Sequence, residues 1–309
     1  VTGIGSDSLY KNTSEGSTAL GYKSGFNNTS GEGNTNIGYQ AGYTNATGDS
    51  NTVIGDESGY YNTGRDNTFI GYESGKANTS GAYNVYLGSQ SGDNTSNSIH
   101  QICIGVNSGG TGGNYNVMIG GYSGNVNNTD GHQNTFIGTS SGYNNTSGSD
   151  NVIIGRSAGH SQTTADNNTM VGKEAGRNNT ASNNTFFGYK SGYSNTSGTN
   201  NTMIGYEDGY TSISGANNTM IGYEAGYSNT GSNNTFIGWT AGTYENGVYN
   251  ICLGRTSGRT SSDSHSEDNN LYIDCNRYGT ESFIYGDLTS IPSSTSEYLT
   301  SDRRMTVNA

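Results

Sequence analysis

The side chains most often used in catalysis and metal binding are few in this chain and scattered along it. Its four histidines lie in separate segments without the short spacing of a metal-binding motif: His100, His132, His160 and His265. A G-x-x-S-G motif recurs, but its serine is shifted by one position from that of the G-x-S-x-G nucleophile elbow. There is no P-loop and no calcium-binding β-roll consensus. We therefore expect no catalytic residue, no cofactor, no metal site and no enzymatic activity. Scattered carboxylates are expected to be solvated, with weak calcium binding as the alternative.

The three cysteines have no zinc-site spacing. Cys103 and Cys252 occupy the same repeat position nine units apart, roughly 43 Å at 4.8 Å per unit, so they cannot form a disulfide with each other. Two alternatives stay open for the cysteines: buried free thiols, or a pair between Cys252 and Cys275.

Modification of asparagine is a further chemistry that the sequence offers. The triplet Asn-x-Ser/Thr, the acceptor of N-linked glycans in a eukaryotic secretory pathway, occurs sixteen times. A repeat built of Asn and Thr also generates this triplet by chance, so glycosylation and its absence are both open. Sites in loops are favoured over sites just before strands, and the candidate acceptors are Asn12, Asn28, Asn45, Asn78, Asn94, Asn127, Asn145 and Asn195.

These residues are positioned by a repeat whose clearest copy reads N-T-F-I-G-Y-E-S-G at 67–75. Sixteen copies align on the glycine after the apolar residue, from Gly5 to Gly254, at intervals of 15 to 18 residues. A period this short indicates a solenoid with one winding per unit, because helical repeats need about 30 residues or more. We predict an all-β chain: a parallel β-solenoid, or β-roll, of about 16 windings of 16–17 residues over 1–258.

Three strand positions precede the aligned glycine. The residue directly before it is apolar in every copy, and the residue three before it is Thr, Val or Ile. Strand side chains alternate between two faces, so we expect these two positions to line the interior together.

The residue between them is then expected to face outward. Soluble monomers rarely expose so long an apolar stripe, so we predict that it is an oligomer interface, with a monomer whose own loops cover it as the alternative. Its largest members are Phe69, Met118, Phe136, Met170, Phe186, Met203, Met220 and Phe236.

The polar positions of the repeat also have expected roles. Asn lies four residues before the glycine in most copies and should form a hydrogen-bonded ladder. A second glycine, preceded by Ser or Ala, suits a tight corner, although Leu9 replaces it in the first copy. Tyrosines one and five residues after the first glycine form rows, joined once by Trp239, that should stack outside or contact carbohydrate.

Composition limits the classes of partner. The net charge is −12 and no basic stretch is present, which argues against nucleic-acid binding. No 18-residue apolar run occurs, so no membrane span is expected. The chain starts at Val1 without a signal peptide, and we expect a processed product or part of a longer protein. Residues 259–309 leave the repeat, and three strand-like runs at 271–274, 282–287 and 304–308 predict a C-terminal β cap.

The N-T-x-I-G-Y-x-[SA]-G repeat resembles the head repeats of trimeric autotransporter adhesins, which are left-handed parallel β-rolls and homotrimers. It is closer still to long repeat proteins of bacterial surfaces and phage-type fibres. In those proteins the array is followed by L-Y-I-D, I-Y-G-D and V-x-I-N segments. Here the tail reads L-Y-I-D at 271–274, F-I-Y-G-D-L at 283–288 and T-V-N at 306–308. The resemblance implies a left-handed, trimeric rod on a cell surface or virion.

The leading functional prediction is a structural or adhesive rod of an extracellular fibre or surface appendage, with copies of the same chain as partners and a trimer favoured. The alternative is a glycan-binding module that uses the Tyr rows and loops. A less favoured alternative is an ice-binding solenoid, because the Thr column is expected to face inward. Polysaccharide cleavage is the least favoured, since the acidic clusters it needs are missing.

Overall fold

The computed structural model describes residues 1–93, 96–110, 112–125, 130–258, 268–273 and 284–287. The chain divides into two units, Val1–Asp166 and Asn167–Ala309, and each is described by itself. Within the described residues both units are all-β, without a helix. The predicted fold class, a parallel β-solenoid, is confirmed, with seventeen parallel strands among these residues.

Unit 1 contains ten strands, one for each repeat copy. Each is three residues long and ends at the residue before the aligned glycine. They are β1 (Thr2–Ile4), β2 (Thr18–Leu20), β3 (Thr35–Ile37), β4 (Thr52–Ile54), β5 (Thr68–Ile70), β6 (Val85–Leu87), β7 (Ile102–Ile104), β8 (Val117–Ile119), β9 (Thr135–Ile137) and β10 (Val152–Ile154).

Unit 2 contains eight strands, of which three are lengthened to five residues. They are β11 (Thr169–Val171), β12 (Thr185–Phe187), β13 (Thr202–Tyr206), β14 (Thr219–Tyr223), β15 (Thr235–Trp239), β16 (Ile251–Leu253), β17 (Asn270–Ile273) and β18 (Ile284–Asp287).

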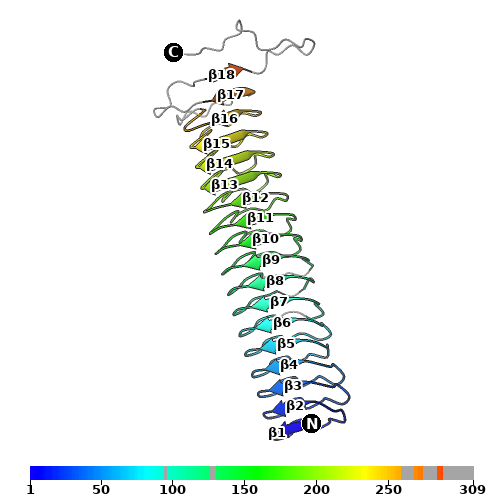
Figure 1. Ribbon diagram of the computed structural model, residues 1–309. Coiled ribbons are helices and arrows are strands. Elements are labelled where there is room, and N and C mark those ends of the chain that lie inside the picture. The colour runs from blue at the N-terminus through cyan, green and yellow to red at the C-terminus, as the bar shows by residue number, and fades with distance from the viewer. Residues whose placement is uncertain (94–95, 111, 126–129, 259–267, 274–283, 288–309) are drawn as a thin grey trace. The chain divides into compact units, whose positions relative to one another are not determined.

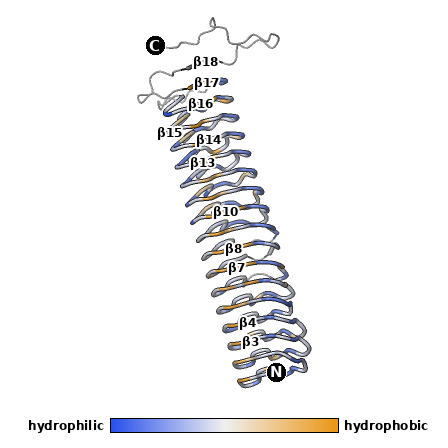
Figure 2. The backbone as a smooth tube through the Cα atoms, viewed as in Figure 1, coloured by the Kyte–Doolittle hydropathy of each residue, from blue (hydrophilic) through white to orange (hydrophobic). Residues whose placement is uncertain are grey.

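Within each unit, successive strands up to β17 stack in chain order and pair in parallel (Figure 1). The register places equivalent repeat positions over one another: Phe69 pairs with Val53, and Met203 pairs with Met220. Each winding therefore repeats the same cross-section, with hydrophobic residues at the strands and hydrophilic residues in the turns (Figure 2). Each copy of the repeat thus forms one winding, as the period predicts.

The interior is lined by the middle residue of each strand, and the expected assignment of the two faces is wrong. Phe69 is fully buried, whereas the adjacent Ile70 is 38% exposed. The eight residues predicted as an outward interface are buried in their own chain and cannot contact another copy: Phe69, Met118, Phe136, Met170, Phe186, Met203, Met220 and Phe236. Alternation shows only that neighbouring residues face opposite ways. Which face is interior depends on the wall across the winding.

That opposite wall is the column of second glycines. Gly142 has φ 55°, and a Cβ on it would lie 2.8 Å from the ring of Phe136. Gly192 has φ 61°, and a Cβ on it would lie 2.7 Å from the ring of Phe186. Glycine is therefore needed both for the left-handed backbone and for the space that each large core side chain occupies.

In the first winding the sizes are exchanged: the strand position is small and the corner position is large. Its strand supplies only Gly3 at the core position, followed by Ala19 in β2. Leu9, from the corner where the second glycine belongs, is only 8% exposed and fills the space that these small residues leave. The departure of the first copy from the repeat is thus a compensating exchange of a large and a small residue.

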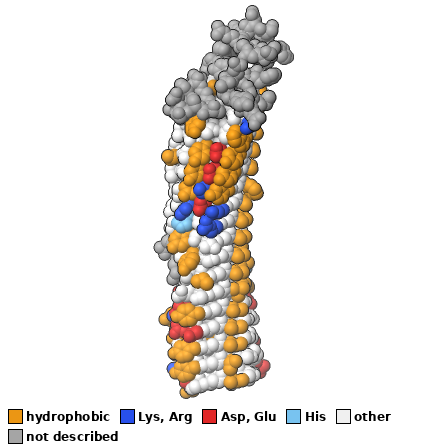
Figure 3. All heavy atoms as spheres, turned by 90° about the vertical axis from the view of Figure 1, so that its left-hand side faces the viewer, with side chains coloured by type: hydrophobic (Ala, Val, Ile, Leu, Met, Phe, Trp, Pro, Cys, Tyr) orange, Lys and Arg blue, Asp and Glu red, His pale blue; other side chains and the backbone are white. Residues whose placement is uncertain are grey.

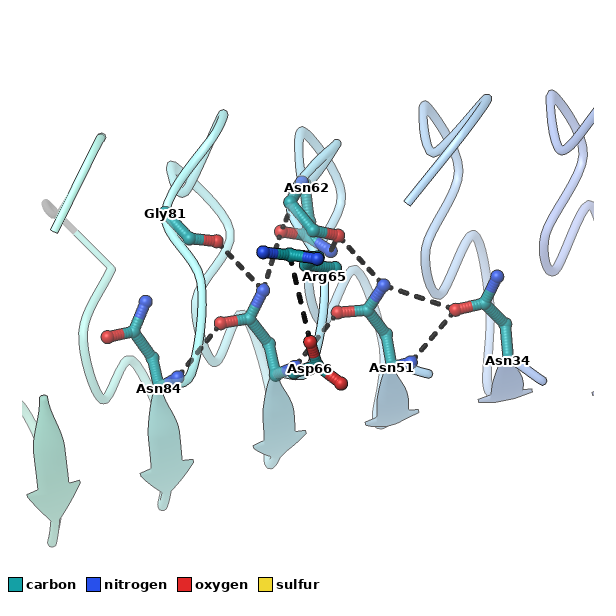
Figure 4. A network of polar contacts seen from close by, with 9 residues as sticks. Asn34, Asn51, Asn62, Arg65, Asp66, Gly81 and Asn84 are labelled. Carbon is teal, nitrogen blue, oxygen red and sulfur yellow. Dashed lines mark hydrogen bonds and ion pairs between the residues drawn. The ribbon is translucent and has the colours of Figure 1, made fainter. Parts of the chain in front are cut away.

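A buried asparagine ladder connects the windings, as the sequence predicts (Figure 4). The backbone N–H of Asn51 donates to Oδ1 of Asn34 at 2.9 Å, and the N–H of Asn67 donates to Oδ1 of Asn51 at 3.0 Å. The amide of Asn67 also donates to the carbonyl of Gly81 in the next winding at 2.9 Å. Each Asn thus satisfies backbone groups that no strand partner reaches.

The solenoid continues beyond residue 258, where the repeat was expected to end. β17 pairs in parallel with β16, and the N–H of Asn270 donates to Oδ1 of Asn250 at 2.8 Å. Tyr272, only 5% exposed, extends the core column. Asp274 stands where the aligned glycine would be, so alignment on glycine assigned the predicted strand-like run at 271–274 to the cap and not to a further winding. β18 pairs antiparallel with β17. The predicted tail strand at 304–308 lies outside the described residues, and the cap and the handedness stay predictions.

Candidate functional site

The histidines that the structure describes are engaged in packing or backbone contacts. His100 stacks between two tyrosine rings with centroids 4.9 and 5.1 Å away, and His160 stacks on another at 5.1 Å. His132 accepts a backbone hydrogen bond at Nδ1, 2.9 Å from its donor. His265 lies outside the described residues. In the described ranges, no three His, Cys, Asp or Glu side chains gather closely enough to hold a metal ion.

The thiols of Cys103 and Cys252 are free and buried, as one of the two alternatives expected. Burial raises the pKa of both thiols, and for Cys252 the charge of Glu245 adds to the rise. Thiols held in the neutral form and away from solvent are poor nucleophiles. Cys275, the other predicted partner of Cys252, lies outside the described residues.

The recurring serine of G-x-x-S-G braces adjacent windings. Ser74 is buried, and its Oγ donates to the carbonyl of Tyr86 in the next winding at 3.0 Å. Ser191 donates in the same way to the carbonyl of Met203 at 2.7 Å. The side chain is small, buried and committed to a backbone acceptor, which is a structural role and explains why only Ser or Ala is common here.

The candidate glycan acceptors lie mostly in a second buried asparagine column. The side chains of Asn28, Asn45, Asn78, Asn145 and Asn195 are at most 2% exposed, Asn12 is partly exposed, and Asn94 and Asn127 lie outside the described residues. Asn195 donates to the carbonyl of Gly198 at 2.8 Å and accepts its N–H at 3.1 Å. An amide nitrogen used in this way inside the fold cannot carry a glycan without disrupting the turn. The preference for loop sites is therefore wrong for these five residues.

Exposed sequons are found instead just before the strands. Asn167, Asn183, Asn200 and Asn217 are exposed and adopt φ between 58° and 64°. They occupy the turn that leads into β11, β12, β13 and β14. If the chain is glycosylated, the fold directs the glycans to this turn.

The feature that the fold leaves open to a partner is the outward side of the strands. We call it the T-x-I face and define it by the first and third residues of the three-residue strands and of their counterparts in β13–β15. Ile4, Leu20 and Phe187 are 60%, 46% and 53% exposed. The third-position residues are Ile4, Leu20, Ile37, Ile54, Ile70, Leu87, Ile104, Ile119, Ile137 and Ile154 in unit 1, and Val171, Phe187, Ile204, Ile221, Ile237 and Leu253 in unit 2.

The T-x-I face carries no charged residue at either position. Its first position is Thr in most strands and Val or Ile in the others, so a hydroxyl group lies across most strands from the apolar third residue. Figure 3 shows a narrow column of hydrophobic side chains running along each unit. The face is therefore an uncharged array that repeats at the strand spacing of about 4.8 Å.

The aromatic rows stack, as the sequence predicts. Tyr206 and Tyr223 have ring centroids 4.9 Å apart and an interplanar angle of 3°. Tyr43 and Tyr60 are 5.0 Å apart at 14°. Rings stacked in this way present edges and hydroxyl groups outward, while their faces are occupied by each other. Face-on stacking of a sugar ring, the usual aromatic contact with carbohydrate, has little room here.

One buried carboxyl breaks the repeat. Asp208 holds the position of Ser or Ala before the second glycine and is fully buried. Its oxygens accept the backbone N–H groups of Ala225 at 2.7 Å and Gly222 at 2.8 Å. Burial raises the pKa of Asp208 to about 7, and the charge of Glu224 adds to the rise. The two hydrogen bonds act in the opposite direction and lower the pKa. Asp208 follows β13, and its acceptor contact to Gly222 reaches the next lengthened strand, β14.

Searches of protein-family models, curated proteins and solved structures gave no match for this chain. In the part of the chain that the structure describes, no helical segment has the length and apolar character needed to cross a membrane.

Proposed function

We propose that the chain is a structural rod of an extracellular fibre or surface appendage, assembled side by side with copies of itself through the T-x-I face. The observation that carries the proposal is that the core is complete within one chain while this apolar face stays outside. Ile204 is 37% exposed beside Met203, which is fully buried. The face is therefore surplus to the fold of a single chain.

The size of the face suits such an interface. At about 4.8 Å per strand and about 10 Å for three residues, the ten strands of the face in unit 1 present about 480 Å² and the six in unit 2 about 290 Å², a sum of about 770 Å². A stable interface buries about 800 Å² on each partner, and monomers rarely leave a larger apolar patch exposed. A second copy has the same repeat and no opposing charge, so it matches the face along its length. Closed symmetry then limits assembly to a small ring of copies, and the family resemblance favours three.

The location proposed is a cell surface or a virion fibre. It is supported by the acidic, cysteine-poor composition and by the resemblance of the repeat to surface and fibre proteins. No chemistry is assigned to the rod, since among the described residues the G-x-x-S-G serines, the thiols of Cys103 and Cys252 and the buried asparagines are part of its own packing and hydrogen bonding.

Light scattering on the purified chain at neutral pH tests the assembly. We expect a mass that is a multiple of one chain, three being favoured. Ile204→Lys should lower that mass, because it places a charge on the T-x-I face. The matched control is Ile213→Lys, since Ile213 is also exposed, at 52%, but lies in a turn. A monomeric parent chain, or equal masses for the two variants, would contradict the proposal.

Ice binding is the second candidate, because the Thr column faces outward and not inward as expected. Thr202, Thr219 and Thr235 are partly exposed at successive strands of a regular uncharged sheet, an arrangement suited to ordering water. The same face cannot be packed against copies and also bind ice. A monomer with thermal hysteresis that is lost in Thr219→Tyr would favour this candidate over the rod.

A further inference from the structure

Unit 2 carries two neighbouring columns of stacked aromatic rings. The first runs from Tyr189 through Tyr206 and Tyr223 to Trp239, with centroids 5.1, 4.9 and 6.0 Å apart. The second consists of Tyr193, Tyr210 and Tyr227, with centroids 5.0 and 5.2 Å apart. Figure 3 shows hydrophobic side chains, a class that includes Tyr and Trp, interspersed with charged ones on one face of the molecule.

A charged residue follows each tyrosine of the first column, whereas the uncharged Thr240 follows Trp239. Directly after β13 and β14 these residues are Glu207 and Glu224, both partly exposed. We call Tyr206, Glu207, Tyr210, Tyr223, Glu224 and Tyr227 the tyrosine–glutamate strip. It lies beside the T-x-I face and shares no residue with the first and third strand positions that define that face.

One winding below the strip, the chain places its own ammonium group among the rings. Lys190 Nζ lies 5.1, 5.7 and 5.3 Å from the centroids of Tyr189, Tyr193 and Tyr210. It is also 3.8 Å from Oε1 of Glu207. This contact shows that the space between the columns suits an alkylammonium group with carboxylate and aromatic neighbours.

Unit 1 shows how the repeat neutralises two successive carboxylates. Glu57 and Glu73 occupy the same repeat position as Glu207 and Glu224. Lys76 Nζ lies 2.6 Å from Oε2 of Glu57 and 2.6 Å from Oε1 of Glu73, so one ammonium group bridges both.

The strip in unit 2 has no such lysine. Tyr227 holds the repeat position of Lys76. Among the described residues, no Lys, Arg or His is within 4.0 Å of the Glu224 carboxylate. The charge of Glu224 and a side-chain hydrogen bond with it raise the pKa of Tyr223, and burial together with the charge of Glu207 raises the pKa of Tyr227.

We propose that the tyrosine–glutamate strip is a binding site for a primary alkylammonium group, which takes the place beside Glu224 that Lys76 fills between its own two glutamates. The ammonium group donates hydrogen bonds to the carboxylates and tyrosine hydroxyls while its methylene groups lie against the ring edges. Its source is a lysine side chain of a partner protein or a free polyamine, which share this chemistry. The net charge of −12 favours the approach of either one.

Trp239, the only tryptophan of the chain, stacks on Tyr223 and so reports on the site. The fluorescence of Trp239 is followed while N-acetyl-lysine methylamide is added to the intact chain, with its uncharged norleucine counterpart as the control. A second titration uses spermidine. We expect a saturable change with the lysine compound and none with norleucine. Tighter saturation by spermidine would assign the source to polyamines, whereas equal or weaker binding would assign it to lysine side chains.

Three variants locate the binding. Glu224→Gln should weaken it about fivefold, the scale of a partly exposed ion pair. Tyr227→Lys should abolish it, because the new side chain reproduces the internal bridge of Lys76. Glu32→Gln removes an exposed carboxylate from unit 1 and should leave binding unchanged. A change without saturation, an equal response to norleucine, or equal binding by parent and Glu224→Gln would overturn the proposal.

Discussion

The buried carboxyl of Asp208 predicts an unusual dependence of stability on pH. In an unfolded chain this group has its ordinary pKa of 3.8, whereas burial raises the pKa to about 7 in the fold. Between these values the folded protein holds a proton that the unfolded chain has lost. The stabilisation from Asp208 is therefore fully present below pH 3.8 and is lost as the pH rises to about 7.

The magnitude follows from the width of that interval. A separation of about three pH units at 1.36 kcal/mol per unit corresponds to at most about 4 kcal/mol. In Asp208→Ser the titrating group is gone. The Ser hydroxyl should donate to the carbonyl of Met220, as Ser191 donates to that of Met203 at 2.7 Å. The variant should thus gain on the parent as the pH rises, by up to about 4 kcal/mol between pH 4 and pH 8.

The assay is urea unfolding at intervals between pH 4 and pH 8, followed by the fluorescence of Trp239. This residue lies in β15, next but one to β13 along the stack, so its signal reports on the windings around Asp208. Asp49→Ser is the matched control, because Asp49 is exposed in unit 1. A stability difference between Asp208→Ser and the parent that stays constant across this range would refute the reasoning, since it would show a carboxyl with an ordinary pKa.

Two further predictions test the direction of the core and the role of its glycines. Phe136→Ala should cost about 3–5 kcal/mol of unfolding free energy because it opens a cavity, whereas Ile137→Ala, on the outward face, should cost less than about 1 kcal/mol in a dissociated chain. Urea unfolding at low protein concentration measures both. A larger cost for Ile137→Ala would show that the third strand residue, and not the middle one, faces the interior. Gly142→Ala should destabilise the chain by more than about 1 kcal/mol, since the φ of Gly142 is 55° and the new Cβ would lie 2.8 Å from the ring of Phe136. Gly121→Ala is the control and should unfold like the parent, because a Cβ on Gly121 would meet no atom nearer than 3.8 Å.

The part of the candidate site that the sequence predicted correctly is the part that depends on local repetition. Stacking of the Tyr rows followed from their constant position in the repeat. The T-x-I face was missed as an interface because its residues were assigned to the interior. A signal for the correct choice was present: the second glycine is retained in copies where the middle strand residue is Phe, Tyr or Met, as expected of two positions that share one space.

The sequence alone determined that the chain is a stack of β-windings, because a period of 16 or 17 residues admits one winding and nothing longer. It also determined the turns and the asparagine ladder, since these depend on contacts between identical positions one period apart. The tertiary structure decided which side of each strand is interior. It also decided that the asparagines of the loop sequons are buried, and that the strand-like run at 271–274 continues the parallel stack without the aligned glycine. The physical reason is the same in each case. These properties depend on which residues face each other across the winding, and the period of the repeat alone does not say which residues those are.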